Sequence, residues 1–160
     1  MNKILNYILI FFLFALLSCD YKPILSKKKN NQFSIYVSEI SGEEKINSII
    51  INNFKNLQND KKEYHLNLSS NKEKNIVSKD SKGDPSIFEL IIDVNYKVKK
   101  DGEILIDDQV IEKTTYNNIS DKFELSKSEE MLKDNLVENL VTEIINSASN
   151  FLQSSKINDN

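Results

Sequence analysis

The sequence is poor in the residues that build metal sites, nucleotide loops and covalent crosslinks. It has one cysteine, one histidine, three glycines and two prolines, and it contains no arginine or tryptophan. A single cysteine cannot form a disulfide within the chain, so burial of apolar surface must stabilise the fold. One histidine does not make a zinc site, and so few glycines argue against a nucleotide-binding loop. We therefore expect no enzyme activity, no metal and no cofactor.

The absence of arginine limits how the protein could bind an anion. All 21 basic residues are lysines, and lysine presents a single ammonium group where arginine presents a bidentate guanidinium. Removing residues 1–18 takes away Lys3 and no acid, which leaves 20 lysines against 24 acids and a net charge of −4. This is not the basic excess typical of nucleic-acid binding, so we expect no nucleic-acid partner.

The only cysteine, Cys19, ends an apolar run at the N-terminus. Residues 4–17 are almost wholly apolar, Lys3 gives the start a positive charge, and a serine precedes the thiol. This layout is typical of a secretory signal, and a cysteine at its end is typical of a bacterial lipoprotein. We expect residues 1–18 to be a signal peptide and Cys19 to carry the lipid that anchors the protein to a membrane. The alternative, an uncleaved membrane span, is disfavoured because about 14 apolar residues are fewer than the ~20 that a helix needs.

The remaining chain is long enough for one domain. We expect a tether over residues 19–31, a single domain over 32–153 and a disordered tail over 154–160. Alternation of apolar and polar residues predicts a strand that starts at Phe33 and another over 64–68, and helical spacing between them predicts a helix over about 43–58. The next segment, residues 69–86, is polar and contains a glycine and a proline, so we expect a mobile loop.

The second half of the domain contains a hairpin and a long helix. A strand over 87–99 has one apolar and one polar face, and Asp101-Gly102 predicts a tight turn into a fourth strand over 104–116. Strict alternation would bury an acid at Asp107 or Asp108, so we expect a bulge there. Ser126 and Glu129 have the spacing of a capping box, which predicts a final helix over about 127–153. The predicted fold is α/β, an α+β two-layer sandwich: a four-stranded mixed sheet with two helices on one face, in the order βαβββα.

Two features that resemble functional motifs have simpler interpretations. His65 alternates outward from its predicted strand, so a surface histidine is favoured over a ligand. Residues 80–84 resemble a calcium-binding loop, but they lack the alternating ligands and the closing bidentate glutamate. Neither feature predicts a catalytic or metal site.

The start of the expected mature chain carries a resemblance to a known family. Residues 19–24 (Cys-Asp-Tyr-Lys-Pro-Ile) resemble the Cys-Gly-Tyr/Phe-x-Pro-Leu start of LptE, the lipopolysaccharide-assembly lipoproteins of Gram-negative bacteria. Asp20 stands where that family usually has glycine, and in enteric bacteria an acid there favours the inner membrane. Further family features follow in the same order, namely Tyr96, the Asp101-Gly102 turn, Tyr116-Asn117 and the long terminal helix.

The resemblance implies a function and partners. It implies a lipid-anchored protein on the periplasmic side of the outer membrane, which plugs the barrel protein LptD, assists its assembly and helps deliver lipopolysaccharide to the cell surface. It also implies basic side chains that contact lipopolysaccharide, for which Lys97, Lys99 and Lys100 are the candidates. A solvated strand edge is the equally weighted alternative for these lysines. The competing function is a lipoprotein that activates a periplasmic enzyme such as a peptidoglycan synthase.

Overall fold

The computed structural model describes residues 34–55 and 63–158. The chain separates into two units, residues 1–31 and 32–160, and all described residues belong to the second unit. The expected signal peptide, the tether and Cys19 therefore lie outside the described residues, as does the predicted end of the first helix at residue 58.

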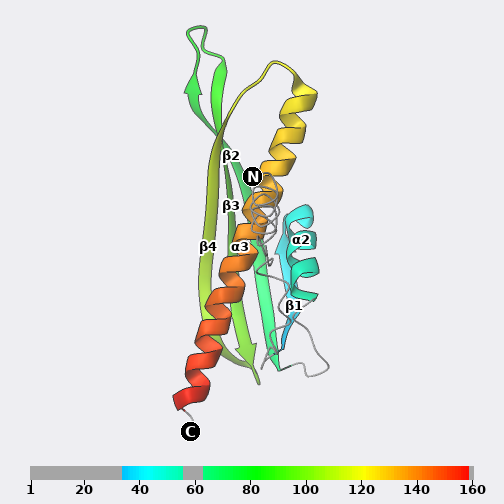
Figure 1. Cartoon of the computed structure of the whole chain (residues 1–160), viewed down its shortest axis with the longest axis vertical. Coiled ribbons are helices and arrows are strands. Elements are labelled where there is room, and N and C mark those ends of the chain that lie inside the picture. The colour runs from blue at the N-terminus through cyan, green and yellow to red at the C-terminus, as the bar shows by residue number, and fades with distance from the viewer. Residues whose placement is uncertain (1–33, 56–62, 159–160) are drawn as a thin grey trace, which may run out of the picture. The chain divides into compact units, whose positions relative to one another are not determined.

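Four strands form one sheet in the order β1-β2-β3-β4 (Figure 1). Strand β1 pairs in parallel with β2, and the other two pairings are antiparallel. The turn between β3 and β4 has positive φ angles at Asp101 (50°) and Gly102 (87°), as a tight hairpin turn requires. The predicted mixed sheet and hairpin are confirmed. The strands are β1 (Ile35–Gly42), β2 (Tyr64–Lys79), β3 (Pro85–Lys100) and β4 (Glu103–Asn117).

Two helices, α2 (Glu44–Lys55) and α3 (Lys122–Asn158), cover one face of this sheet (Figure 1). Helix α2 buries every fourth residue, and β3 buries every second one, because these are the periods at which a helix and a strand present one face. The element order βαβββα and the two layers are confirmed. The largest fully buried side chains between the layers are Tyr96, Phe54, Ile35, Ile46, Ile50, Leu66, Ile92, Leu140, Ile144, Leu152, Val94 and Val98. Neither described helix is long and apolar enough to cross a membrane.

Gly42 ends β1 and directs the chain into α2. Its φ is +97°, and a Cβ at this position would lie 1.8 Å from the carbonyl oxygen of Ser70 on β2. The backbone N–H of Glu43 donates to the Ser70 hydroxyl at 3.1 Å, and this hydroxyl donates to Asn47 of α2 at 2.7 Å. Only glycine allows so close an approach, so this residue sets the point where β1 leaves the sheet.

The prediction of a mobile loop over residues 69–86 is wrong. Strand β2 runs to Lys79, and β3 starts at Pro85, so most of the segment forms a hairpin that extends beyond the end of β1. The side chains of β2 become exposed after Ser70. The segment therefore lacks the alternation of apolar and polar residues that marks a half-buried strand, although its backbone pairs with β3 throughout.

Two local predictions in the second half also need correction. Helix α3 starts at Lys122 rather than 127, because the Asp121 carboxylate accepts hydrogen bonds from the backbone N–H groups of Phe123 (2.9 Å) and Glu124 (3.1 Å). Ser126 and Glu129 therefore lie inside the helix and form no capping box. The helix continues to Asn158, so it includes residues 154–158, which the composition assigned to a disordered tail.

The bulge expected at Asp107 and Asp108 lies earlier in the strand. Val98 and Lys99 of β3 pair with Ile106 and Ile104, which leaves Leu105 as the extra residue of β4. Alternation is regular after it, so Asp108 does lie on the helix-covered face. It remains exposed because β4 is the outermost strand.

Candidate functional site

The sheet has an open face, which we define as the side of β2, β3 and β4 that points away from α2 and α3. The strand register aligns its side chains in rows across the sheet. One row contains Asn67, Lys97 and Asp107, and the next contains Ser69, Asn95 and Gln109. These side chains are polar because alternation directs most apolar residues of each strand to the helices, although Ile91 and Ile111 lie on the open face.

Hydrogen bonds and ion pairs connect this face from strand to strand. The Asp93 carboxylate accepts hydrogen bonds from the amides of Asn71 (3.1 Å) and Gln109 (3.4 Å), so it links β2, β3 and β4. Lys97 and Asp107 form an ion pair at 2.9 Å, and Asn67 donates to Glu39 of β1. Such cross-strand contacts hold polar side chains in place. These rows of the open face therefore form an ordered polar surface.

The structure separates the three predicted lysines. Lys97 and Lys99 lie on the open face, at alternate positions of β3. Lys100 lies on the opposite side, where its ammonium group forms an ion pair with Glu63 at 3.4 Å and lies 5.2 Å from the centre of the Tyr64 ring. Among the described residues, Lys99 alone of the three forms no ion pair.

A second polar cluster fixes α3 to the extended part of the sheet, and the sequence did not predict it. Glu129 of α3 accepts hydrogen bonds from Lys74 of β2 and from the Tyr116 hydroxyl of β4, the latter at 2.8 Å. The Lys74 ammonium group also lies 4.1 Å from the centre of the Phe88 ring. Burial raises the pKa of Glu129, but the contacts with Lys74 and Tyr116 outweigh burial and hold this pKa below its usual value.

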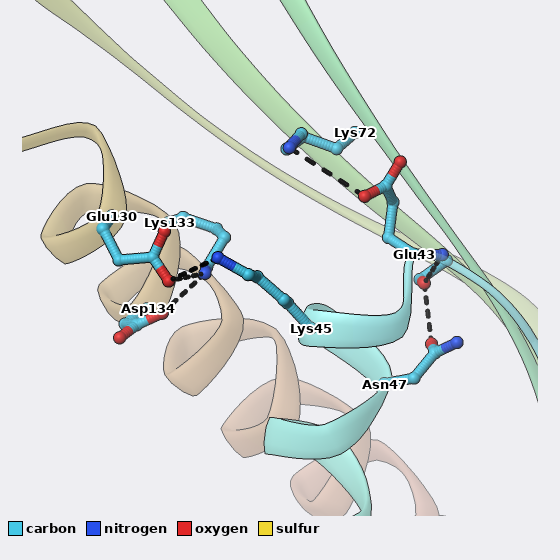
Figure 2. Close-up of polar contacts among 8 residues, drawn as sticks. Glu43, Lys45, Asn47, Lys72, Glu130, Lys133 and Asp134 are labelled. Atoms are coloured by element: carbon cyan, nitrogen blue, oxygen red, sulfur yellow. Dashed lines mark hydrogen bonds and ion pairs between the residues drawn. The ribbon is translucent and has the colours of Figure 1, made fainter. Parts of the chain in front are cut away.

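A third cluster lies where α2 meets α3 (Figure 2). Lys133 of α3 is only 5% exposed, and its ammonium group contacts Glu130 at 2.6 Å and Asp134 at 3.2 Å. Lys45 of α2 reaches the same Glu130 carboxylate at 3.5 Å. Burial lowers the pKa of Lys133, but the two carboxylates outweigh burial and raise it above the usual value. Both clusters join structural elements to one another, so they stabilise the fold and leave the open face accessible.

The described residues contain no group of three or more histidine, cysteine, aspartate or glutamate side chains that could hold a metal ion. His65 lies on the open face, where its Nδ1 is 2.7 Å from the Ser38 hydroxyl and its ring meets Tyr36 edge to face. These contacts orient a surface side chain on the sheet. The arrangement as a whole is suited to recognition of another molecule by an ordered polar surface.

Comparison with known proteins identifies a family and a shared fold. The family model for LptE, described as lipopolysaccharide-assembly, matches residues 34–148. No curated protein sequence matches the chain.

Solved structures of three bacterial lipoproteins share the fold. Rare lipoprotein B from Shewanella oneidensis superposes with a TM-score of 0.59 at 16% identity, over 77% of this chain and 98% of that protein. A putative lipoprotein from Caulobacter crescentus superposes with a TM-score of 0.59 at 15% identity, over 76% of this chain and 92% of that protein. Lipoprotein B from Nitrosomonas europaea superposes with a TM-score of 0.57 at 20% identity, over 75% of this chain and 88% of that protein. At these identities the likeness is one of fold.

Proposed function

Because the chain belongs to the LptE family of lipopolysaccharide-assembly proteins, we propose that it is a plug and assembly subunit of an LptD-type outer-membrane barrel. In this proposal Cys19 carries the lipid anchor, the domain lies on the periplasmic side of the outer membrane, and the protein helps deliver lipopolysaccharide to the cell surface. The protein acts by binding, without catalysis.

The observation that supports this proposal is the contrast between the two faces of the sheet. The apolar face is already covered by α2 and α3, whereas the open face is polar and is held by contacts such as Asn71–Asp93 and Lys97–Asp107. The interior of a large outer-membrane barrel is also polar. The polar rows of the open face are thus suited to contact the polar barrel lumen.

Within this proposal, Lys97 and Lys99 are the lysines of the open face that contact the phosphates of lipopolysaccharide. Lys99 has no carboxylate partner among the described residues, and Lys97 has only an exposed one, so both ammonium groups are accessible to an anion. Lys100 is a weaker candidate because Glu63 already neutralises it. Contacts of this kind are screened by salt over ~8 Å at physiological ionic strength.

Affinity purification of the full-length protein in mild detergent tests the proposed partner. The expected result is a one-to-one complex with an outer-membrane barrel. Recovery of a peptidoglycan synthase with no barrel would contradict the proposal and support the enzyme-activating alternative.

Lipopolysaccharide binding is tested separately by replacing Lys97, Lys99 and Lys100 together with glutamate. We expect this variant to lose lipopolysaccharide binding while it retains the barrel, and added salt should weaken binding to the wild type in the same way. The matched control replaces three other exposed lysines with glutamate, namely Lys79, Lys82 and Lys127. Equal lipopolysaccharide affinity of the first variant and the wild type would remove the lysines from the proposal.

A further inference from the structure

The outer edge of β4 is a long strand edge that no described strand pairs with. It extends over Glu103–Asn117, and regular alternation after the bulge at Leu105 gives residues 106–117 a continuous register with β3. Every second residue of an edge strand directs its backbone N–H and C=O groups outward, where another strand can reach them. On this edge the N–H of Gln109 donates to the Asp108 carboxylate at 2.8 Å, and an added strand would replace this local hydrogen bond. The edge of β4 is thus a template for strand addition.

The side chains along this edge carry unpaired negative charge. Asp108 and Glu112 lie on the helix side of β4, four residues apart, and neither forms an ion pair with the described residues. The buried Val110 lies between them. Burial raises the pKa of nearby Tyr96, the hydrogen bond with Ser147 lowers it, and the negative charges of Asp108 and of Glu143 on α3 raise it further.

Strand addition would place partner residues directly opposite these side chains. Cross-strand neighbours on the same face have Cβ atoms about 5 Å apart, so opposite charges there attract and like charges repel. The partner residues opposite Asp108 and Glu112 would be four positions apart, and the residue midway between them would lie opposite Val110. On the other face, Ile111 is 55% exposed and would favour an apolar neighbour.

Charge argues against a second copy of this chain in the register centred on Val110. Two β4 edges paired antiparallel about Val110 would bring Asp108 of each copy opposite Glu112 of the other, which sets carboxylate against carboxylate. Acidic side chains on a strand edge discourage such self-pairing. The same charges favour a different protein that is basic at these positions.

We propose that the edge of β4 around residues 108–112 binds an extended basic segment of a partner protein by strand addition. The segment carries two basic residues four positions apart, opposite Asp108 and Glu112, with apolar residues between them. This inference does not depend on the proposed barrel complex, and the experiment below uses no barrel.

The test measures binding of labelled seven-residue peptides to the full-length protein in mild detergent by fluorescence anisotropy. One peptide has the sequence Thr-Lys-Val-Val-Val-Lys-Thr, and the comparison peptide has glutamate in place of both lysines. We expect the lysine peptide to bind at least about tenfold more tightly, because two cross-strand charge pairs change from attraction to repulsion. Equal affinities of the two peptides would overturn the proposal.

Protein variants and modified peptides separate strand addition from general attraction between charges. Replacing Asp108 and Glu112 with lysine should weaken binding of the lysine peptide about tenfold. Replacing Glu124 and Glu138 with lysine makes the same change in net charge on α3 and should leave binding unchanged. An equal loss in both double variants would overturn the proposal.

Methylation of alternate backbone amides of the lysine peptide tests the hydrogen bonds directly. Methyl groups on one set of alternate amides should abolish binding, and methyl groups on the other set should not, because only one set faces β4. If both methylated peptides bind like the parent peptide, the contact is electrostatic only and strand addition is wrong. This measurement uses the wild-type protein, so it does not depend on the folding of any variant.

Discussion

Replacing Gly42 with alanine should destabilise the protein strongly, because this glycine lets β1 turn into α2 beside Ser70. Alanine at a φ of +97° carries a backbone strain of about 1–2 kcal/mol. The added Cβ would also lie 1.8 Å from the Ser70 carbonyl oxygen, which no side-chain rotation can relieve. Moving the backbone away breaks the hydrogen bonds that Ser70 forms with Glu43 and Asn47, at about 1 kcal/mol each. The expected loss of unfolding free energy is about 3–5 kcal/mol.

Gly102→Ala is the matched control, because Gly102 also has a positive φ (+87°) but has no atom within 4 Å of the added Cβ. It should cost only the backbone strain of about 1–2 kcal/mol. Urea denaturation followed by circular dichroism measures both variants against the wild type. If Gly42→Ala and Gly102→Ala have the same unfolding free energy, the close approach to Ser70 does not contribute as argued.

Three further predictions concern the core, the anchor and pH. Ile144→Asp should lower the unfolding free energy by several kcal/mol, because it places an unpaired carboxylate where the side chain is fully buried; a melting temperature within a degree or two of wild type would show that this position is not core. Cys19→Ala should leave a precursor without lipid, and unchanged processing and acyl mass in intact-mass spectrometry would refute the anchor. The pKa of Glu129 is below its usual value of 4.5, so its contribution to stability is complete above that pH and is lost as the pH falls through the lower folded-state value. Wild type should therefore lose more stability than Glu129→Gln on acidification below pH 4.5, and parallel acid titrations of the two proteins would contradict this.

The parts of the fold that depend on regular burial are predictable from the sequence. Strand β3 alternates apolar and polar residues, and α2 repeats its apolar residues with helical spacing, so the residue pattern alone identifies both elements. The turn at Asp101-Gly102 is also predictable, because few residues tolerate two successive positive φ angles. The order of elements and the antiparallel pairing of β3 with β4 follow from these features.

The extension of β2 to Lys79 could not be predicted in the same way. Beyond Ser70 neither helix α2 nor strand β1 accompanies β2, so its side chains are exposed and carry no apolar alternation. This part of the strand is formed only by backbone hydrogen bonding with β3. Backbone hydrogen bonding does not require a particular order of apolar and polar side chains, so the sequence pattern does not indicate it. The contacts of Glu129 could not be predicted for a related reason, since its partners Lys74 and Tyr116 are distant in the chain.

The candidate site is predictable only in part. The alternation in β3 indicates which side chains of this strand are polar and exposed. These side chains are one part of a polar surface that extends over β2, β3 and β4. Alternation also places Lys100 on the side opposite Lys97 and Lys99. The sequence does not give its partners there, Glu63 and Tyr64. Cross-strand contacts such as Asn71–Asp93 require the register, which single-strand patterns do not give.

Site-specific photocrosslinking in cells tests most directly whether the open face contacts the barrel. A photoreactive phenylalanine derivative is introduced at Asn95, in the middle of the open face, or at Thr142, which is exposed on α3. We expect a crosslink from position 95 to an outer-membrane barrel protein and a much weaker one from position 142. A barrel crosslink that forms only from position 142, or no barrel crosslink from either position, would contradict this expectation.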